Sequence, residues 1–267
     1  MPDDRPIGAF DSGVGGLSIV SEVRRLLPTE DVIFLADSLH CPYGPRPEEQ
    51  IRALSAAAVE VLIERGAKLV VVACNTASVA SLAHLRQRYG VPFVGIVPAV
   101  KPAAERTRSK RVGVIATNTT LRGRIFDELI ARFAADVVVF RQVCPGLVEL
   151  AEEGLCAGPE AESALRDCLS PLLAERIDTL VLGCTHYVFF RPLIQRLAGD
   201  EIAVIDTGEP VARQVARLLD THETHSRRQA PGRLTLLTTG DPEHFATVVG
   251  RLTGERVVAE RVELALD

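Results

Sequence analysis

Two cysteines stand at the ends of apolar runs, and each begins a short polar segment. Residues 74–76 (Cys-Asn-Thr) follow the apolar run 69–73, and residues 184–186 (Cys-Thr-His) follow the run 179–183. A helical pattern comes after each segment. In open α/β sheets, ligands bind outside the carboxyl ends of the strands. We therefore predict that two thiols face binding crevices, where they can remove and return a proton on opposite faces of one carbon.

The neighbours of these cysteines favour proton transfer. A helix N-terminus after Cys74 is expected to lower the pKa of its thiol, because it stabilises the thiolate. Asn75 and Thr76 are polar at the same junction, although such residues also cap helices. His186 lies two residues beyond Cys184 and can assist proton transfer there. A cysteine after a buried strand is otherwise a packing residue, and this is the role that we predict for the remaining four, Cys41, Cys144, Cys156 and Cys168.

Other strand ends are polar as well. They carry Asp11-Ser12, Asp37-Ser38 and the run 117–120 (Thr-Asn-Thr-Thr). Helix N-termini at such positions suit a small anion such as a carboxylate. Asp11 can orient an ammonium group or a proton donor, and it can equally cap the helix that follows.

The glycine-rich residues 13–16 resemble part of a dinucleotide-binding loop, and Asp37 lies near the distance expected of a ribose ligand. Ser18, however, occupies the third glycine position of that motif, which disfavours nucleotide binding. The P-loop pattern is absent. No C-x-x-C or H-E-x-x-H occurs, so local spacing predicts no metal site.

Apolar runs alternate with longer periodic segments, as expected of parallel sheets covered by helices on both faces. We predict strands at 6–10, 31–36, 68–73, 92–96, 111–116, 136–140, 178–182 and 202–205. We predict helices at 15–27, 47–65, 77–89, 120–134, 146–154, 159–176, 188–198 and 209–220. After a polar linker at 221–232, the tail contains a strand at 233–238, a helix at 242–252 and a strand at 256–264.

The two halves of this pattern resemble each other. Residues 7–12 match 112–117, and 31–34 match 136–139, at an offset of about 105 residues. Such a common order and offset indicate an internal duplication. The predicted fold is therefore α/β, with two open-sheet units.

Composition excludes several functions. The 267 residues carry a net charge of −5, which argues against nucleic-acid or anionic-membrane binding. No apolar run is long enough for a membrane span, and the acidic start is no signal peptide. We expect a cytoplasmic protein, in which disulfides are rare.

Four segments together resemble the cofactor-independent aspartate/glutamate racemase family, and they occur in the expected order over most of the chain. They are residues 10–17 (Phe-Asp-Ser-Gly-Val-Gly-Gly-Leu), 41–44 (Cys-Pro-Tyr-Gly), 73–78 (Ala-Cys-Asn-Thr-Ala-Ser) and 182–187 (Leu-Gly-Cys-Thr-His-Tyr). One departure is Val188, where the family usually has proline; it puts only the local helix geometry in doubt.

The resemblance implies two pseudo-symmetric α/β domains that face each other across a central cleft, with 1–97 plus 209–267 as the first and 98–208 as the second. It implies interconversion of L- and D-glutamate, for peptidoglycan synthesis, without pyridoxal phosphate or metal. Carried over by position, the acid/base thiols are Cys74 and Cys184, and the residues that assist them are Asp11, His186 and Glu152. The substrate-binding residues would be Asp11, Ser12, Tyr43, Gly44, Asn75, Thr76, Thr117, Thr185 and His186.

Three alternatives stay open at this point. A related racemase or decarboxylase would act on aspartate, hydantoins or malonates with the same thiols. A non-catalytic small-molecule sensor could use the same scaffold, and a dinucleotide oxidoreductase is the third. A homodimer is compatible with the sequence, which has no local signature for one.

Overall fold

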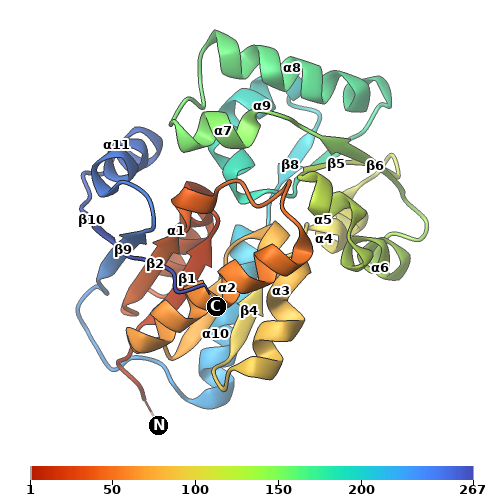
Figure 1. Cartoon of the computed structure of the whole chain (residues 1–267). Helices are drawn as coiled ribbons and strands as arrows, with labels where there is room; N and C mark the ends of the chain where they lie inside the picture. Colours follow the sequence, from red (N-terminus) through yellow and green to blue (C-terminus); the bar gives the residue numbers. More distant parts are fainter. Residues whose placement is uncertain (1, 267) are drawn as a thin grey trace.

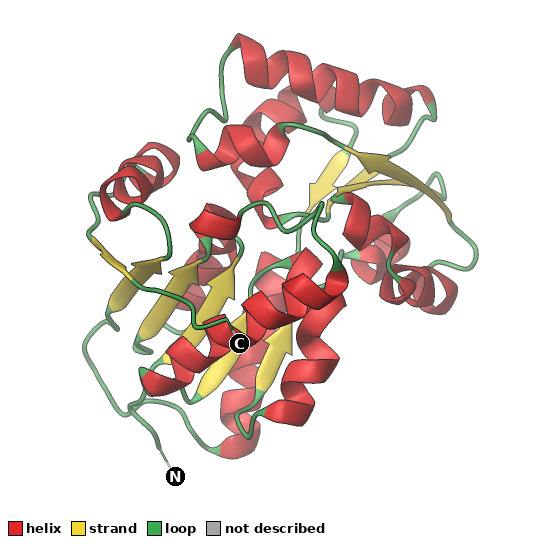
Figure 2. Cartoon of the chain, viewed as in Figure 1, coloured by secondary structure: helices red, strands yellow, loops and turns green. Residues whose placement is uncertain are grey.

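The computed structural model describes residues 2–266, and in this part of the chain two parallel β-sheets organise the molecule (Figures 1 and 2). The first sheet contains β1 (Ile7–Asp11), β2 (Val32–Ala36), β3 (Leu69–Val72), β4 (Phe93–Gly95), β9 (Leu234–Thr238) and β10 (Ala259–Arg261). The second contains β5 (Arg111–Ala116), β6 (Val138–Val143), β7 (Thr179–Leu182) and β8 (Ala203–Ile205). Figure 1 shows the two sheets in separate lobes of the molecule.

The two sheets share a strand order. The first runs β10-β9-β2-β1-β3-β4 and the second runs β6-β5-β7-β8. When β9 and β10 of the tail are left out, the two sheets have the same order. In each, the strand that comes first along the chain lies between the second and the third, and the fourth lies beside the third. This shared topology is what the matched halves of the sequence predict. Because all pairings are parallel, the carboxyl ends of the strands in each sheet lie at one edge.

Helices connect the strands and cover both sheets. They are α1 (Leu17–Leu26), α2 (Glu48–Glu64), α3 (Asn75–Arg88), α4 (Val100–Arg106), α5 (Asn118–Arg122), α6 (Arg124–Phe133), α7 (Leu147–Glu152), α8 (Pro159–Ala174), α9 (Arg191–Ala198), α10 (Gly208–His222) and α11 (Pro242–Thr253). Short 3-10 helices, η1 (Val14–Gly16), η2 (Ser38–His40) and η3 (Thr185–Phe190), follow β1, β2 and β7.

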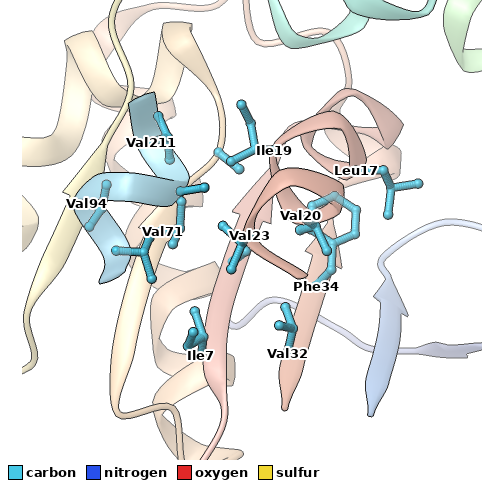
Figure 3. Close-up of a cluster of buried hydrophobic side chains, with 14 of the residues drawn as sticks. Ile7, Leu17, Ile19, Val20, Val23, Val32, Phe34, Val71, Val94 and Val211 are labelled. Atoms are coloured by element: carbon cyan, nitrogen blue, oxygen red, sulfur yellow. The ribbon is translucent and has the colours of Figure 1, made fainter. Parts of the chain in front are cut away.

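The first sheet is buried on both faces, because alternate side chains of a strand point to opposite sides. Ile7 and Ala9 of β1 pack in the cluster formed with α1, α10 and α11, whereas Phe10 packs with α2 and α3. Figure 3 shows Val20 and Val23 of α1 in the first of these clusters. Because helices pack on both faces of the sheet, the strand ends that carry the predicted site residues are held in fixed positions.

The second sheet is covered in the same way. On one face Val112, Val114 and Val181 pack with α4 and α6, and on the other Leu180 and Leu182 pack with α7, α8 and α9. Each sheet therefore has a hydrophobic core on either side.

Three local predictions differ from the structure. Helix α4 was not predicted, because Pro102 obscures it; proline is nevertheless tolerated in a first helical turn. The helix predicted at 120–134 breaks at Gly123, whose backbone is extended, and a Cβ there would lie 2.6 Å from Val79 Cγ1. The helix predicted at 188–198 begins only at Arg191, because the 3-10 helix η3, which contains Val188, precedes it.

The C-terminal tail completes the first sheet, since β9 pairs with β2 and β10 pairs with β9. A buried ion pair fixes the linker that leads to it. Lys68 Nζ donates to Glu30 Oε2 at 2.6 Å and to the Thr224 carbonyl at 2.8 Å. Glu30 Oε1 accepts from the Ser226 N–H at 2.8 Å. The linker is therefore held against the sheet at the end opposite to the predicted site.

The expectation that disulfides are absent is wrong for one pair. Cys144 follows β6 and is bonded to Cys168 in α8, with the two Cα atoms 5.3 Å apart. The packing of α8 against the end of β6 brings together two cysteines that 24 residues separate in the chain. Within residues 2–266, no helix combines the length and apolar character needed to cross a bilayer.

Candidate active site

The predicted site residues meet where the carboxyl ends of the two sheets face each other. One small cavity is lined by all the residues predicted from the sequence except Asp11 and Glu152: Ser12, Tyr43, Gly44, Cys74, Asn75, Thr76, Thr117, Cys184, Thr185 and His186. Its volume is about 10 Å³, which is roughly the space of one water molecule. A bound amino acid therefore requires its walls to move apart.

A much larger hollow, of about 1150 Å³, lies elsewhere between α1, α10 and the tail. None of the predicted site residues lines it. We therefore assign the site by its chemistry, and the small cavity between the thiols is the candidate.

Cys74 caps helix α3. Its Sγ accepts a hydrogen bond from the Ala77 N–H at 3.5 Å and donates to Ser12 Oγ at 3.8 Å. Burial of the thiol, together with the nearby charge of Asp11, raises the pKa of Cys74 well above its ordinary value, although the Ala77 N–H acts in the opposite direction. The expectation of a lowered pKa is therefore wrong, because desolvation outweighs the helix N-terminus.

Cys184 occupies the matching position at the end of β7. It is buried, and its Sγ lies 3.8 Å from His186 Nδ1. The 3-10 helix η3 turns the His186 ring back toward Cys184, so the thiol and the imidazole are neighbours in space as well as in sequence. Gly183, directly before Cys184, lets the end of β7 pack closely against the end of β5, because a Cβ there would lie 2.9 Å from Ala116 Cβ.

Glu152 lies behind His186, at the end of α7. His186 Nε2 and Glu152 Oε1 are 2.5 Å apart, and the same oxygen accepts from the Val14 N–H at 2.8 Å. Burial alone would lower the pKa of His186, but its hydrogen bonds with Cys184, Cys41 and Glu152 outweigh burial and raise it well above the usual value. The imidazole thus retains its proton to a higher pH than a free histidine.

Asp11 lies beneath Cys74 and is fully buried. Its Oδ1 accepts from the Ser12 N–H at 2.6 Å, and its Oδ2 accepts from Thr185 Oγ1 at 2.9 Å. Burial raises the pKa of Asp11, in spite of the positive charge of His186 and these hydrogen bonds. The side chain of Asp11 caps neither η1 nor α1. The alternative that Asp11 is a helix cap is therefore wrong.

Tyr43 and Gly44 reach the cavity through a loop that contains a cis bond between Cys41 and Pro42. Tyr43 Oη donates to Asp37 Oδ2 at 2.6 Å. Asp37 is itself fully buried and also accepts from Thr239 Oγ1 at 2.7 Å. It therefore orients the loop and is not exposed to contact a ribose, which removes the main support for the dinucleotide alternative.

Contacts between the two lobes close the other side of the cavity. Thr76 Oγ1 and Thr117 Oγ1 are 2.9 Å apart, and Thr119 Oγ1 donates to the Gly44 carbonyl at 2.6 Å. Asn75 is buried beside them, and among the described residues neither its side-chain nitrogen nor its oxygen has a hydrogen-bond partner. An unpaired buried amide is costly, so Asn75 has unused capacity for a ligand.

The sequence did not predict that Cys41 lies beside the site. It was predicted to be a packing residue, but its sulfur lies close to His186 and Glu152. Burial raises the pKa of Cys41 to about 11, although the neighbouring His186 acts in the opposite direction. The adjacent residues Pro42 and Tyr43 were the available signal, because they line the cavity. Cys156 does not line this cavity.

Known proteins share this sequence and this fold. A sequence model of the Asp/Glu/hydantoin racemase family matches residues 17–215. A glutamate racemase of a Roseiflexus species is 50% identical over 264 residues, which covers 98% of this chain and 96% of that protein.

Two solved structures are similar over nearly all of the chain. Glutamate racemase from Francisella tularensis, in complex with D-glutamate, is 28% identical with a TM-score of 0.84 and covers 98% of both chains. Glutamate racemase from Escherichia coli, in complex with L-glutamate and an activator, is 36% identical with a TM-score of 0.82 and covers 93% of this chain and 95% of that one.

Proposed function

The chain belongs to the Asp/Glu/hydantoin racemase family, and we propose that it interconverts L- and D-glutamate with two cysteine thiols and no bound cofactor. The observation that carries this proposal is the pair Cys74 and Cys184, at equivalent strand ends of two sheets with one cavity between them. The D-glutamate supplies peptidoglycan synthesis.

Inversion of a carbon requires proton removal on one face and proton delivery on the other. One thiolate takes the α-proton, the C–H electron pair stays on the α-carbon, and the other thiol delivers its own proton to the opposite face. The two sulfurs thereby exchange protonation states. Cys74 takes the proton from D-glutamate and Cys184 takes it from L-glutamate, as the family resemblance implies.

The surroundings of the thiols support this chemistry. The α-hydrogen is far less acidic than a thiol, whose reference pKa is about 8.5, so the base must be strong and the developing charge must be stabilised. Burial raises the pKa of Cys74, which makes its thiolate a stronger base than that of a free cysteine. Exclusion of water from so small a cavity also strengthens each electrostatic interaction inside it.

Three further residues position or assist the thiols. Asp11 acts beside Cys74, and His186 acts beside Cys184, where its raised pKa favours the imidazolium that helps to stabilise a thiolate. Glu152 acts through His186, because it holds Nε2 at 2.5 Å and so fixes the ring with Nδ1 toward the sulfur.

Polar groups on the cavity wall bind the substrate. The unpaired amide of Asn75 suits a carboxylate or the ammonium group, since it offers both a donor and an acceptor. The other substrate-binding residues in this proposal are Asp11, Ser12, Tyr43, Gly44, Thr76, Thr117, Thr185 and His186.

The remaining predictions extend this proposal to the whole chain. The domain boundaries are 1–97 plus 209–267 and 98–208, so that substrate enters when the two domains separate. The protein acts in the cytoplasm on a small molecule, without nucleic acid or membrane, and a homodimer is compatible with this proposal. None of these points depends on a metal or an organic cofactor.

Proton NMR of L-glutamate in D2O tests the proposed function. Added enzyme should remove the α-proton signal while D-glutamate accumulates. L-aspartate, assayed in parallel, should react far more slowly. Faster turnover of aspartate would identify a related racemase, and no turnover of any amino acid would favour a binding protein on the same scaffold.

A further inference from the structure

Three potential metal-ligand atoms come together beside the candidate site. The sulfur of Cys41, a carboxylate oxygen of Glu152 and a ring nitrogen of His186 lie within 4.8 Å of one another. They come from the loop after η2, from the end of α7 and from η3, so no local spacing in the sequence predicts the group. Thiolate, carboxylate and imidazole are the ligand types that Zn²⁺ binds in proteins.

An acidic pocket leads from the surface to this cluster. Its volume is about 170 Å³, and both Cys41 and Glu152 line it. Three further carboxylates, those of Glu149, Glu153 and Asp241, lie in its wall, and among the described residues that line it there is one histidine, His244, and no Lys or Arg. A cleft lined by one sign of charge concentrates counter-ions, so this pocket attracts cations to the sulfur and oxygen ligands.

We propose that Cys41, Glu152 and His186 form a binding site for a soft divalent cation such as Zn²⁺. In a tetrahedral zinc site the ligand atoms are roughly 3.3–3.6 Å apart. The cation would take the place of the proton between His186 Nε2 and Glu152 Oε1, which are now 2.5 Å apart. Glu152 would retreat by about 1 Å to reach the spacing of such a site, into the pocket that it already lines.

Binding is an exchange of protons for the cation and involves no redox change. The S–H bond of Cys41 breaks, a metal–sulfur bond forms, and the proton passes to solvent. The proton between His186 and Glu152 leaves in the same way. The pocket side of the cation stays open for a water molecule as the fourth ligand.

The cation would inhibit racemisation reversibly. It would bind the imidazole of His186, which faces Cys184, and it would draw Glu152 away from that imidazole. This consequence rests on the proposed function, whereas cation binding itself does not.

Cobalt is a suitable probe, because Co²⁺ replaces Zn²⁺ and a thiolate ligand gives it an intense near-ultraviolet charge-transfer band. The full chain, freed of metal with a chelator and with the bond between Cys144 and Cys168 intact, is titrated with Co²⁺. We expect the band to saturate at one equivalent. Addition of Zn²⁺ should then abolish it. Absence of a saturable band in the wild-type protein would overturn the proposal.

Two matched pairs of variants locate the site. Cys41→Ser should lose the charge-transfer band, whereas Cys156→Ser, which changes another free, half-buried cysteine, should retain it. Glu152→Gln should weaken Co²⁺ binding by at least about tenfold, whereas Glu160→Gln, which changes an exposed glutamate outside the pocket, should retain the affinity. Equal bands in the two cysteine variants, or equal affinities in the two glutamate variants, would contradict the assignment. If Cys41→Ser does not fold, the comparison of the two glutamate variants still tests the assignment.

Activity supplies an independent measurement. Zn²⁺ should inhibit the wild-type enzyme, a chelator should restore the rate, and Cys156→Ser should be inhibited like the wild type. If the protein binds one Co²⁺ through Cys41 but has no racemase activity, the proposed function fails and the cation site stands. If Zn²⁺ binds at this site but the rate is unchanged, the inhibitory role is wrong.

Discussion

Thr185 Oγ1 donates a hydrogen bond of 2.9 Å to Asp11 Oδ2, and this bond joins the carboxyl end of β7 in the second sheet to that of β1 in the first. Both residues are buried. The contact between Thr76 and Thr117 also crosses from one sheet to the other. Because the cavity between them has a volume of about 10 Å³, a substrate enters only when such contacts separate. We expect hydrogen bonds with the substrate to replace them.

Thr185→Val tests whether this hydroxyl serves the substrate. The loss of a hydrogen bond to a charged group costs about 1.5–3 kcal/mol, so we expect kcat/KM to fall roughly ten- to a hundredfold. Steady-state kinetics with L-glutamate and D-glutamate measure the effect. Thr221→Val is a matched control, because that hydroxyl donates to a carbonyl of the exposed face of α10. Equal kinetics in the two variants would remove Thr185 from the site.

The enzyme should work without a cofactor. Dialysis against EDTA and hydroxylamine removes divalent metals and pyridoxal phosphate, respectively. We expect the racemisation rate to be unchanged, or to rise if the protein carries an inhibitory cation. Loss of activity that pyridoxal phosphate restores would disprove the two-thiol mechanism.

The buried pair Lys68 and Glu30 should contribute strongly to stability. Their side chains are 1% and 2% exposed, so Lys68→Met leaves an uncompensated charge in the interior. We expect a loss of about 3–5 kcal/mol in the free energy of unfolding, measured by urea denaturation. Lys68→Met combined with Glu30→Gln should recover part of it, because the isolated charge is gone.

Lys101→Met serves as the control for this measurement, because Lys101 and Glu105 form an exposed ion pair at 3.8 Å. Such surface pairs contribute about 0–1 kcal/mol. If Lys68→Met were no more destabilising than Lys101→Met, the buried pair would not hold the linker and the sheet together.

Asp178 should make part of the free energy of unfolding depend on pH in the acid range. Burial alone would raise its pKa, but hydrogen bonds from Thr107 Oγ1 and from the N–H groups of Ser109 and Arg108 lower it to about 2. Because the folded-state pKa is below the ordinary value of 3.8, this contribution is present above pH 3.8 and is lost as the pH falls toward 2.

Asp178→Asn therefore narrows the difference in unfolding free energy between pH 5 and about pH 2.5. Urea unfolding at the two pH values measures that difference. Asp200→Asn makes the same charge change in an exposed residue after α9 and should leave the pH dependence unchanged. An identical pH dependence in the wild type and in Asp178→Asn would contradict the argument.

The order of strands and helices could be predicted because period and polarity are local properties of the chain. Polar residues directly after buried strands also predicted that Cys74 and Cys184 would face binding crevices, and the structure places both at one cavity. Their pKa values could not be inferred in this way. The helix N-terminus after Cys74 is visible in the sequence, whereas the burial that outweighs it comes from the packing of the whole fold.

The other features that the sequence did not predict are contacts between segments that lie far apart along the chain. Cys41 joins His186 and Glu152 through the packing of the two lobes, and Cys144 meets Cys168 because α8 packs against the end of β6. No local spacing predicts either contact, because unrelated helices set the distance along the chain between the partners. The same limit applies to α4, whose Pro102 breaks the helical pattern without breaking the helix.

Cys74 and Cys184 should each be essential for racemisation but should deprotonate opposite enantiomers. Cys74→Ser and Cys184→Ser should each nearly abolish racemisation, because serine is much harder to ionise than cysteine. Cys156→Ser is the matched control and should retain activity, since Cys156 does not line the cavity.

A glutamate analogue with a leaving group beside the α-carbon separates the two roles. Its elimination needs proton removal but no delivery on the opposite face, so one remaining thiol is sufficient. We expect Cys74→Ser to eliminate from the L-analogue, through Cys184, and Cys184→Ser to eliminate from the D-analogue, through Cys74. The two sulfurs would then lie on opposite sides of the α-carbon, as their equivalent positions in the two sheets require. If both variants preferred the same enantiomer, the thiols would not flank that carbon and the mirror-image assignment would be wrong.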